Sequence, residues 1–161
     1  MNKKSLTPLN IFVLCSVFTT LLTGWSLPAL AQGAGLSAQT TMIVLDQSGS
    51  MLQSIGETER YQIAREILLD ITDDISSNAP TGLVSFGHRA SEDCSDFEVL
   101  VQPRFGSAAE LNAGILSVEP INNSKTPLFD SIDLAAQQIP KGQGGVILAV
   151  SDGEENCGKN I

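Results

Sequence analysis

The chain has 161 residues and carries 18 acidic against 9 basic side chains, a formal net charge of −9 at pH 7. Lys3 and Lys4 are the only charged residues before residue 32, so residues 32–161 carry 7 − 18 = −11. Such an acidic balance argues against nucleic acid and against an anionic membrane surface as partners. The length after residue 31 suits one domain and not two.

The N-terminal segment has the pattern of a signal peptide. Two lysines are followed by a mostly apolar run over residues 11–22, and Pro28 precedes the small-x-small pattern Ala29-Leu30-Ala31. We therefore expect export to the periplasm or the cell exterior, with cleavage near Ala31. A membrane anchor needs about 20 apolar residues, more than this run supplies, so no membrane span is expected in the mature chain. Residues 32–40 are small and polar and are predicted to be a linker before a domain at 41–161.

Apolar runs and helical patterns then alternate along the chain. Met42–Leu45 predicts a strand covered on both faces. A helix is predicted over about 58–76, with one buried stripe of isoleucines every four residues at Ile63, Ile67, Ile71 and Ile75 and with Ala64 and Leu68 beside them. Residues 82–87 predict a second buried strand, and the alternation over 97–102 indicates a strand nearer an edge.

The later elements continue this alternation. A short helix is predicted at about 107–117, and a third at about 126–139, with Thr126 as N-cap and Pro127 at the first helical position. Val146–Val150 predicts another fully apolar strand. The order indicates a doubly wound, mainly parallel α/β sheet with helices on both faces. If the first and last strands are neighbours, their shared rim is the place where such sheets bind ligands.

Oxygen-bearing side chains follow both of these strands. Asp46, Ser48 and Ser50 come after the first strand and Asp152 after the last. Hard oxygen donors without Cys or His suit Mg²⁺ or a similar ion better than zinc or copper. Taken singly, each residue has a simpler interpretation as part of a turn or a helix cap. Their convergence on one rim favours a metal site.

These residues resemble the von Willebrand factor type A (vWA) domain and its metal-ion-dependent adhesion site, a D-x-S-x-S motif with a distant Thr and a distant Asp. The motif is filled here by Asp46, Ser48, Ser50, Thr126 and Asp152. The resemblance implies that the three hydroxyls bind Mg²⁺, Mn²⁺ or Ca²⁺ directly and that the two carboxylates act mainly through water. The metal would then complete its coordination with an Asp or Glu carboxylate of a partner protein. It implies a binding module and not an enzyme.

Four longer phrases also resemble exported bacterial members of the family: Gly87-His88-Arg89, Asp93-Cys94-Ser95-Asp96, Lys125-Thr126-Pro127-Leu128 and Val150-Ser151-Asp152-Gly153. The resemblance runs from about Thr41 to Ile161. A complete domain of this type continues with two more strands and their helices, so we expect a domain truncated at its C-terminus. The strand Val146–Val150 would then be an apolar edge.

Two further features carry alternatives. Cys15 falls in the signal peptide, so Cys94 and Cys157 remain; export suggests a disulfide, and whether these two pair with each other stays open. A zinc site of both cysteines with His88, the only histidine, is disfavoured for the same reason.

The competing function is a Mg²⁺-dependent phosphatase or phosphotransferase of the haloacid dehalogenase type, with Asp46 as nucleophile. That family normally has a second Asp two residues later as acid/base, and here the position is Ser48. The binding module is therefore the favoured prediction.

Overall fold

The computed structural model describes residues 39–153 and 155–158. The expected signal peptide at 1–31 lies outside the described residues, as does most of the expected linker. A four-stranded sheet runs in the order β5-β4-β1-β6, with bounds Phe97–Arg104, Thr81–Phe86, Thr40–Asp46 and Gly145–Val150. β1 is parallel to β4 and to β6, whereas β5 is antiparallel to β4. Strand β1 begins at Thr40, the last residue of the expected linker.

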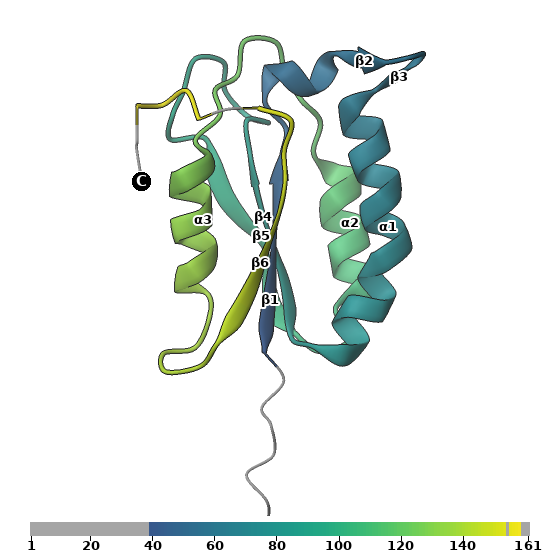
Figure 1. Cartoon of the computed structure of the whole chain (residues 1–161), viewed down its shortest axis with the longest axis vertical. Helices are drawn as coiled ribbons and strands as arrows, with labels where there is room; N and C mark the ends of the chain where they lie inside the picture. Colours follow the sequence, from purple (N-terminus) through teal and green to yellow (C-terminus); the bar gives the residue numbers. More distant parts are fainter. Residues whose placement is uncertain (1–38, 154, 159–161) are drawn as a thin grey trace, which may run out of the picture. The chain divides into compact units, whose positions relative to one another are not determined.

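Helices cover both faces of this sheet (Figure 1). Helices α1 (Arg60–Asn78) and α2 (Ala108–Ser117) lie on one face, and α3 (Leu128–Gln137) lies on the other. The side chains of the central strand alternate accordingly. Ile43 and Leu45 pack with the core residues of α1 and α2, while Met42 and Val44 pack with Ala135 of α3. The predicted α/β class and the predicted adjacency of the first and last strands are confirmed.

The buried stripe of α1 contains the predicted Ala64 and Leu68 but continues through Thr72 and Ser76 instead of the predicted isoleucines. Ile67 is 55% exposed. Small and polar residues on the inner side let α1 approach α2 closely, and the Thr72 hydroxyl donates to Asn112 Oδ1 on α2 at 2.6 Å. Ile63 and Ile67 instead border a groove together with Val150 of β6, while Ile71 packs against the edge of the core.

Local structure near the helix starts also differs from the prediction. The N-cap position of α3 is Pro127 and not Thr126, and no side chain caps it from within the helix. Glu155 does this from outside, because its Oε2 accepts the Phe129 N–H at 3.0 Å. Before α1 the chain forms the 3-10 helix η1 (Gly49–Leu52) and a hairpin of β2 (Ser54–Ile55) and β3 (Thr58–Glu59), none of which the sequence predicted.

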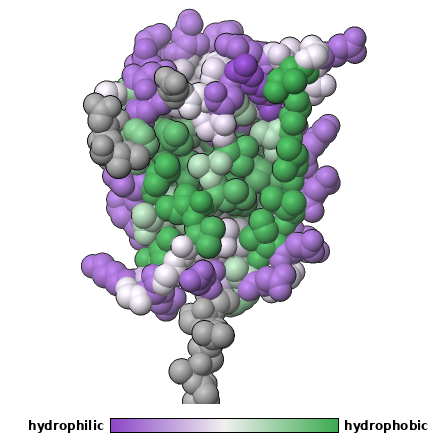
Figure 2. All heavy atoms as spheres, in the orientation of Figure 1, coloured by the Kyte–Doolittle hydropathy of each residue, from purple (hydrophilic) through white to green (hydrophobic). Residues whose placement is uncertain are grey.

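Strand β6 lies at an edge of the sheet and is largely exposed, although its sequence is apolar. Within the described residues it pairs only with β1, and Val146 is 48% exposed. Apolar side chains form a broad surface over and beside this strand (Figure 2). An open apolar edge favours association with other strands. The expectation that further strands complete the sheet here stays a prediction.

The buried stripe of α1 can be tested by two neighbouring substitutions. Leu68→Ala removes a fully buried side chain, so we expect it to lower the free energy of unfolding by about 2–5 kcal/mol. Ile67→Ala, on the exposed flank, should cost less than about 1 kcal/mol. Urea unfolding of both variants measures the two values. Equal losses would contradict the observed orientation of α1.

Candidate metal centre

The site begins where β1 and β6 leave the sheet side by side. Leu45 is aligned with Val150 in the parallel ladder, so Asp46 and Ser151 follow at the same rim. The Asp46 carboxylate is fully buried. Its Oδ1 accepts the Ser48 N–H at 2.7 Å, and its Oδ2 accepts the Ser151 hydroxyl at 2.5 Å. Asp46 thereby joins the loop after β1 to the loop after β6.

Two serine hydroxyls and the second carboxylate form a continuous row of oxygens above Asp46. The hydroxyls of Ser48 and Ser50 lie 3.1 Å apart. Ser50 also donates to Asp152 Oδ1 at 2.8 Å. The alternating spacing of the two serines places both hydroxyls on the same side of the loop, next to the end of β6.

Thr126 reaches the same place from the loop before α3. It is almost fully buried, and its N–H donates to Asn156 Oδ1 at 2.8 Å. A Cβ placed on Gly153 would lie 3.5 Å from Ser50 Oγ and 3.8 Å from Thr126 Oγ1. The structure therefore brings the Thr126 hydroxyl beside Ser50. All five residues predicted from the sequence gather at one rim.

Burial dominates the electrostatics of Asp46. It raises the pKa of this carboxyl above its ordinary value, and the nearby charge of Asp152 acts in the same direction. Hydrogen bonds from Ser151 and Ser48 oppose the shift without cancelling it. A buried carboxylate of this kind is destabilising unless a cation compensates it.

The donor set matches a hard divalent cation. Three hydroxyl and two carboxylate oxygens are the ligand types that Mg²⁺, Mn²⁺ and Ca²⁺ prefer. In the part of the chain that the structure describes, no three His, Cys, Asp or Glu side chains gather as a possible metal site. Three of the five candidate donors are hydroxyls. Ser48, Ser50 and Thr126 would hold the ion.

Three residues of the site were not singled out from the sequence. Ser151 bonds to Asp46, Asn156 holds the backbone of Thr126, and the Arg60 guanidinium forms an ion pair with Asp152 Oδ2. The position of Ser151 at the end of an apolar strand was a usable signal. Nothing in the spacing of Arg60 or Asn156 connects them with the motif.

The loop after β4 supports the site from the side, through Gly87. This residue has φ +77°, and a Cβ there would lie 2.8 Å from Ser48 N. Only glycine adopts that conformation freely and permits such a close approach. The Gly87 N–H donates to the Asp96 carbonyl at 3.0 Å, which fixes the loop against its own far end.

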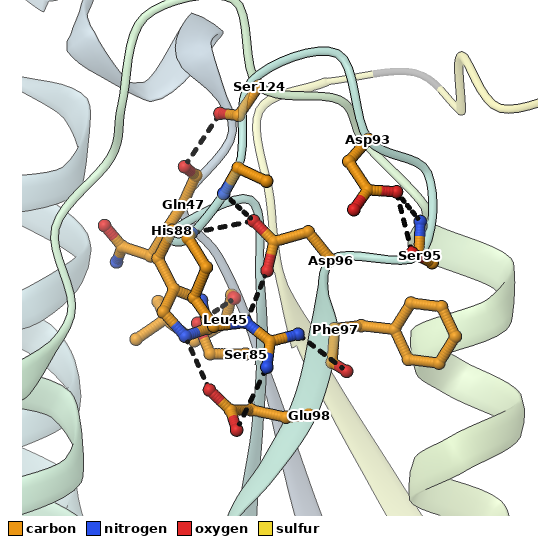
Figure 3. A network of polar contacts seen from close by, with 12 residues as sticks. Leu45, Gln47, Ser85, His88, Asp93, Ser95, Asp96, Phe97, Glu98 and Ser124 are labelled. Atoms are coloured by element: carbon orange, nitrogen blue, oxygen red, sulfur yellow. Dashed lines mark hydrogen bonds and ion pairs between the residues drawn. The ribbon is translucent and has the colours of Figure 1, made fainter.

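A buried carboxylate organises this supporting loop (Figure 3). Asp96 accepts the N–H groups of Arg89 and Ala90 at 2.7 and 2.9 Å, and the Arg89 side chain donates Nε–H to it at 2.8 Å. Burial alone would raise the pKa of Asp96, but these hydrogen bonds outweigh it and the pKa is lowered. The loop therefore has its own polar anchor next to the candidate metal site.

The two cysteines of the described residues form a disulfide, Cys94–Cys157. This answers the pairing that the sequence left open. It also excludes zinc coordination by these two side chains as thiolates, and His88 Nε2 contacts Glu98 Oε1 instead, at 3.0 Å. The bond connects the supporting loop to residues 155–158, which carry Asn156.

The cost of burying Asp46 can be measured in metal-free protein. Because folding raises the pKa of this group, its protonated form stabilises the fold; that contribution is complete below the unfolded pKa of about 3.9 and is lost as the pH rises through the folded pKa. We expect Asp46→Asn to raise the melting temperature at pH 7 in EDTA, and the gain to shrink toward pH 4. Asp70→Asn removes an equal charge from an exposed position of α1 and serves as the control. A lower melting temperature for Asp46→Asn at pH 7 would contradict this account.

Close packing of Gly87 against the motif gives a second test. Gly87→Ala must accept both a strained backbone and the contact with Ser48, whereas Gly142→Ala, at φ +80° with nothing within 4 Å, accepts only the strain. We expect a loss of about 1–2 kcal/mol for Gly142→Ala and at least twice that for Gly87→Ala. Denaturant unfolding compares them. Similar losses would show that the close approach is unimportant.

Comparison with known proteins gives a family match and a structure of similar fold. Residues 41–155 match the family model of the von Willebrand factor type A domain, and no curated protein matches the chain. A solved structure, an uncharacterized membrane-spanning protein from Vibrio fischeri, has a TM-score of 0.50 at 18% identity, which shows the fold alone. The match covers 62% of this chain and 48% of that one, so the chain spans about half of its length.

Two of the expectations from the sequence bear on this comparison. The family match gives no support to the haloacid dehalogenase alternative. Within residues 39–153 and 155–158, no helix combines the length and apolar character that crossing a membrane requires. The matched region contains the sheet from Thr41 onward and all five candidate donors. The chain belongs to the von Willebrand factor type A domain family.

Proposed function

We propose that this domain is a divalent-metal-dependent protein-binding module of the adhesion type. The observation that carries the proposal is the convergence of three hydroxyls and two carboxylates from three separate segments on one rim. Mg²⁺ is the proposed ion, with Mn²⁺ or Ca²⁺ as substitutes. At the family level, vWA domains are protein-interaction modules, which supports binding over catalysis.

Ligand roles follow from the hydrogen bonds already present. Both oxygens of Asp46 are engaged by Ser48 and Ser151, so we assign this carboxylate to positioning and to contacts through water. Ser48, Ser50 and Thr126 would bind the ion through their hydroxyl oxygens. Neutral ligands that bind the metal directly leave much of its charge uncompensated. The ion would then accept an Asp or Glu carboxylate of a partner protein.

Export is part of the proposal. The Cys94–Cys157 disulfide supports it, because such bonds persist in oxidising compartments such as the periplasm and the cell exterior. The signal peptide at 1–31 lies outside the described residues and rests on its sequence pattern alone.

Metal binding should stabilise the domain measurably. For a dissociation constant near 1 mM, 10 mM Mg²⁺ adds about 1.4 kcal/mol, which raises the melting temperature by about 4 °C. Ser50→Ala should abolish the rise because it removes a hydroxyl from the row described above. Asp46→Ala should abolish it because it removes the carboxylate that holds the two loops together. Differential scanning fluorimetry with and without EDTA measures it.

The matched control is Ser54→Ala, at an exposed position in β2 outside the row of oxygens. It should respond to Mg²⁺ like the unmodified chain. An equal response in Ser50→Ala would count against the assignment of the ligands. Two peptides that differ only by Glu or Gln at one position then test the partner carboxylate. The Glu peptide should bind in the presence of metal and not in EDTA, and the Gln peptide should bind in neither condition.

A further inference from the structure

We propose that Arg60 is the resident counter-cation of the metal site. In this inference its guanidinium is held on Asp152 when no metal is bound, and a divalent ion must displace it. Arg60 would thus set the metal affinity of the site. The inference rests on the proposed function, because it concerns the same five ligands.

The contacts of Asp152 place Arg60 in competition with a metal ion. Asp152 Oδ1 accepts the Ser50 hydroxyl at 2.8 Å, and Oδ2 forms the ion pair with Arg60 Nη1. Both carboxylate oxygens are therefore already engaged. An ion that uses Asp152, directly or through a bound water, has to share this carboxylate with the guanidinium or release it.

The pair is partly shielded from solvent, which makes the competition significant. The side chains of Arg60 and Asp152 are 29% and 16% exposed. Charges in such positions interact more strongly than a fully exposed pair and are screened less by salt. The two carboxylates of the site carry a formal charge of −2, and the guanidinium reduces this to −1.

Arg60 occupies a place that helix stability does not favour for a cation. It is the first residue of α1, where the positive end of the helix dipole lies, and the first turn holds no acidic residue. A positive charge there is unfavourable by itself. The pair with Asp152 is therefore the interaction in the structure that explains a cation at this position.

Other cations of the described residues have different partners. Arg65 contacts Glu119 and the Val118 carbonyl, and Arg89 pairs with Asp96 and Glu98. Lys125, although it precedes Thr126, pairs with Glu92. None of these three cations pairs with a candidate ligand of the metal, whereas Arg60 pairs with Asp152.

Replacing Arg60 should therefore strengthen metal binding. We expect Arg60→Gln to lower the dissociation constant for Mg²⁺ by about twofold to fivefold, the upper part of the range for removing one partly exposed ion pair. Arg60→Lys keeps the charge and should stay close to the unmodified chain. Arg104→Gln makes the same change of net charge at the opposite end of the sheet, where Arg104 pairs with Glu110, and should leave the dissociation constant unchanged.

Isothermal titration calorimetry of the full chain with Mg²⁺, after treatment with EDTA, measures these constants. The melting temperature in EDTA gives an independent readout. Arg60→Gln should lower the melting temperature of the unmodified chain. It should not lower that of the Asp152→Asn variant, because the charge that pairs with Arg60 is absent there. Unchanged or weaker Mg²⁺ binding by Arg60→Gln, in a chain that itself binds Mg²⁺, overturns this inference and leaves the proposed function standing. Absence of Mg²⁺ binding by both the unmodified chain and the variant overturns the two together.

Discussion

The buried carboxylate of Asp46 is the constraint on which the rest of the rim depends. It stands at the end of the central strand, where burial raises its pKa and its two oxygens must find donors. The Ser48 N–H and the Ser151 hydroxyl supply them. Because these donors come from different loops, satisfying one carboxylate also fixes the relative position of the motif loop and the loop after β6.

The sheet around this carboxylate is asymmetric. On one side β4 and β5 continue outward, and the loop between them is fastened by Asp96 and by the Cys94–Cys157 bond. On the other side, among the residues that the structure describes, β6 is the apolar edge strand (Figure 2). The candidate site lies between a firmly anchored loop and this exposed edge. Any strand that pairs with β6 would therefore lie next to Asp152, and would change the surroundings of the Arg60 pair.

Much of this arrangement follows from local sequence patterns, and the exceptions are the long-range ones. Continuous apolar runs indicated the central strands, and the position of Asp46 and Asp152 after two such runs indicated the shared rim. The stripe of α1 was only partly predicted because hydrophobicity favours isoleucines, whereas the buried side also carries Thr72 and Ser76, and Thr72 bonds to Asn112 of α2. Arg60 pairs with a residue 92 positions away, and no periodic pattern reports such a contact.

The most direct test of the central claim is to locate a bound ion. Crystals of the domain grown with Mn²⁺ give an anomalous scattering signal at the metal position. We expect one peak within coordination distance of the Ser48, Ser50 and Thr126 hydroxyl oxygens, beside Asp152 and next to Asp46. A peak at the other acidic loop, around Asp93, or no peak near these hydroxyls at millimolar Mn²⁺, would contradict it.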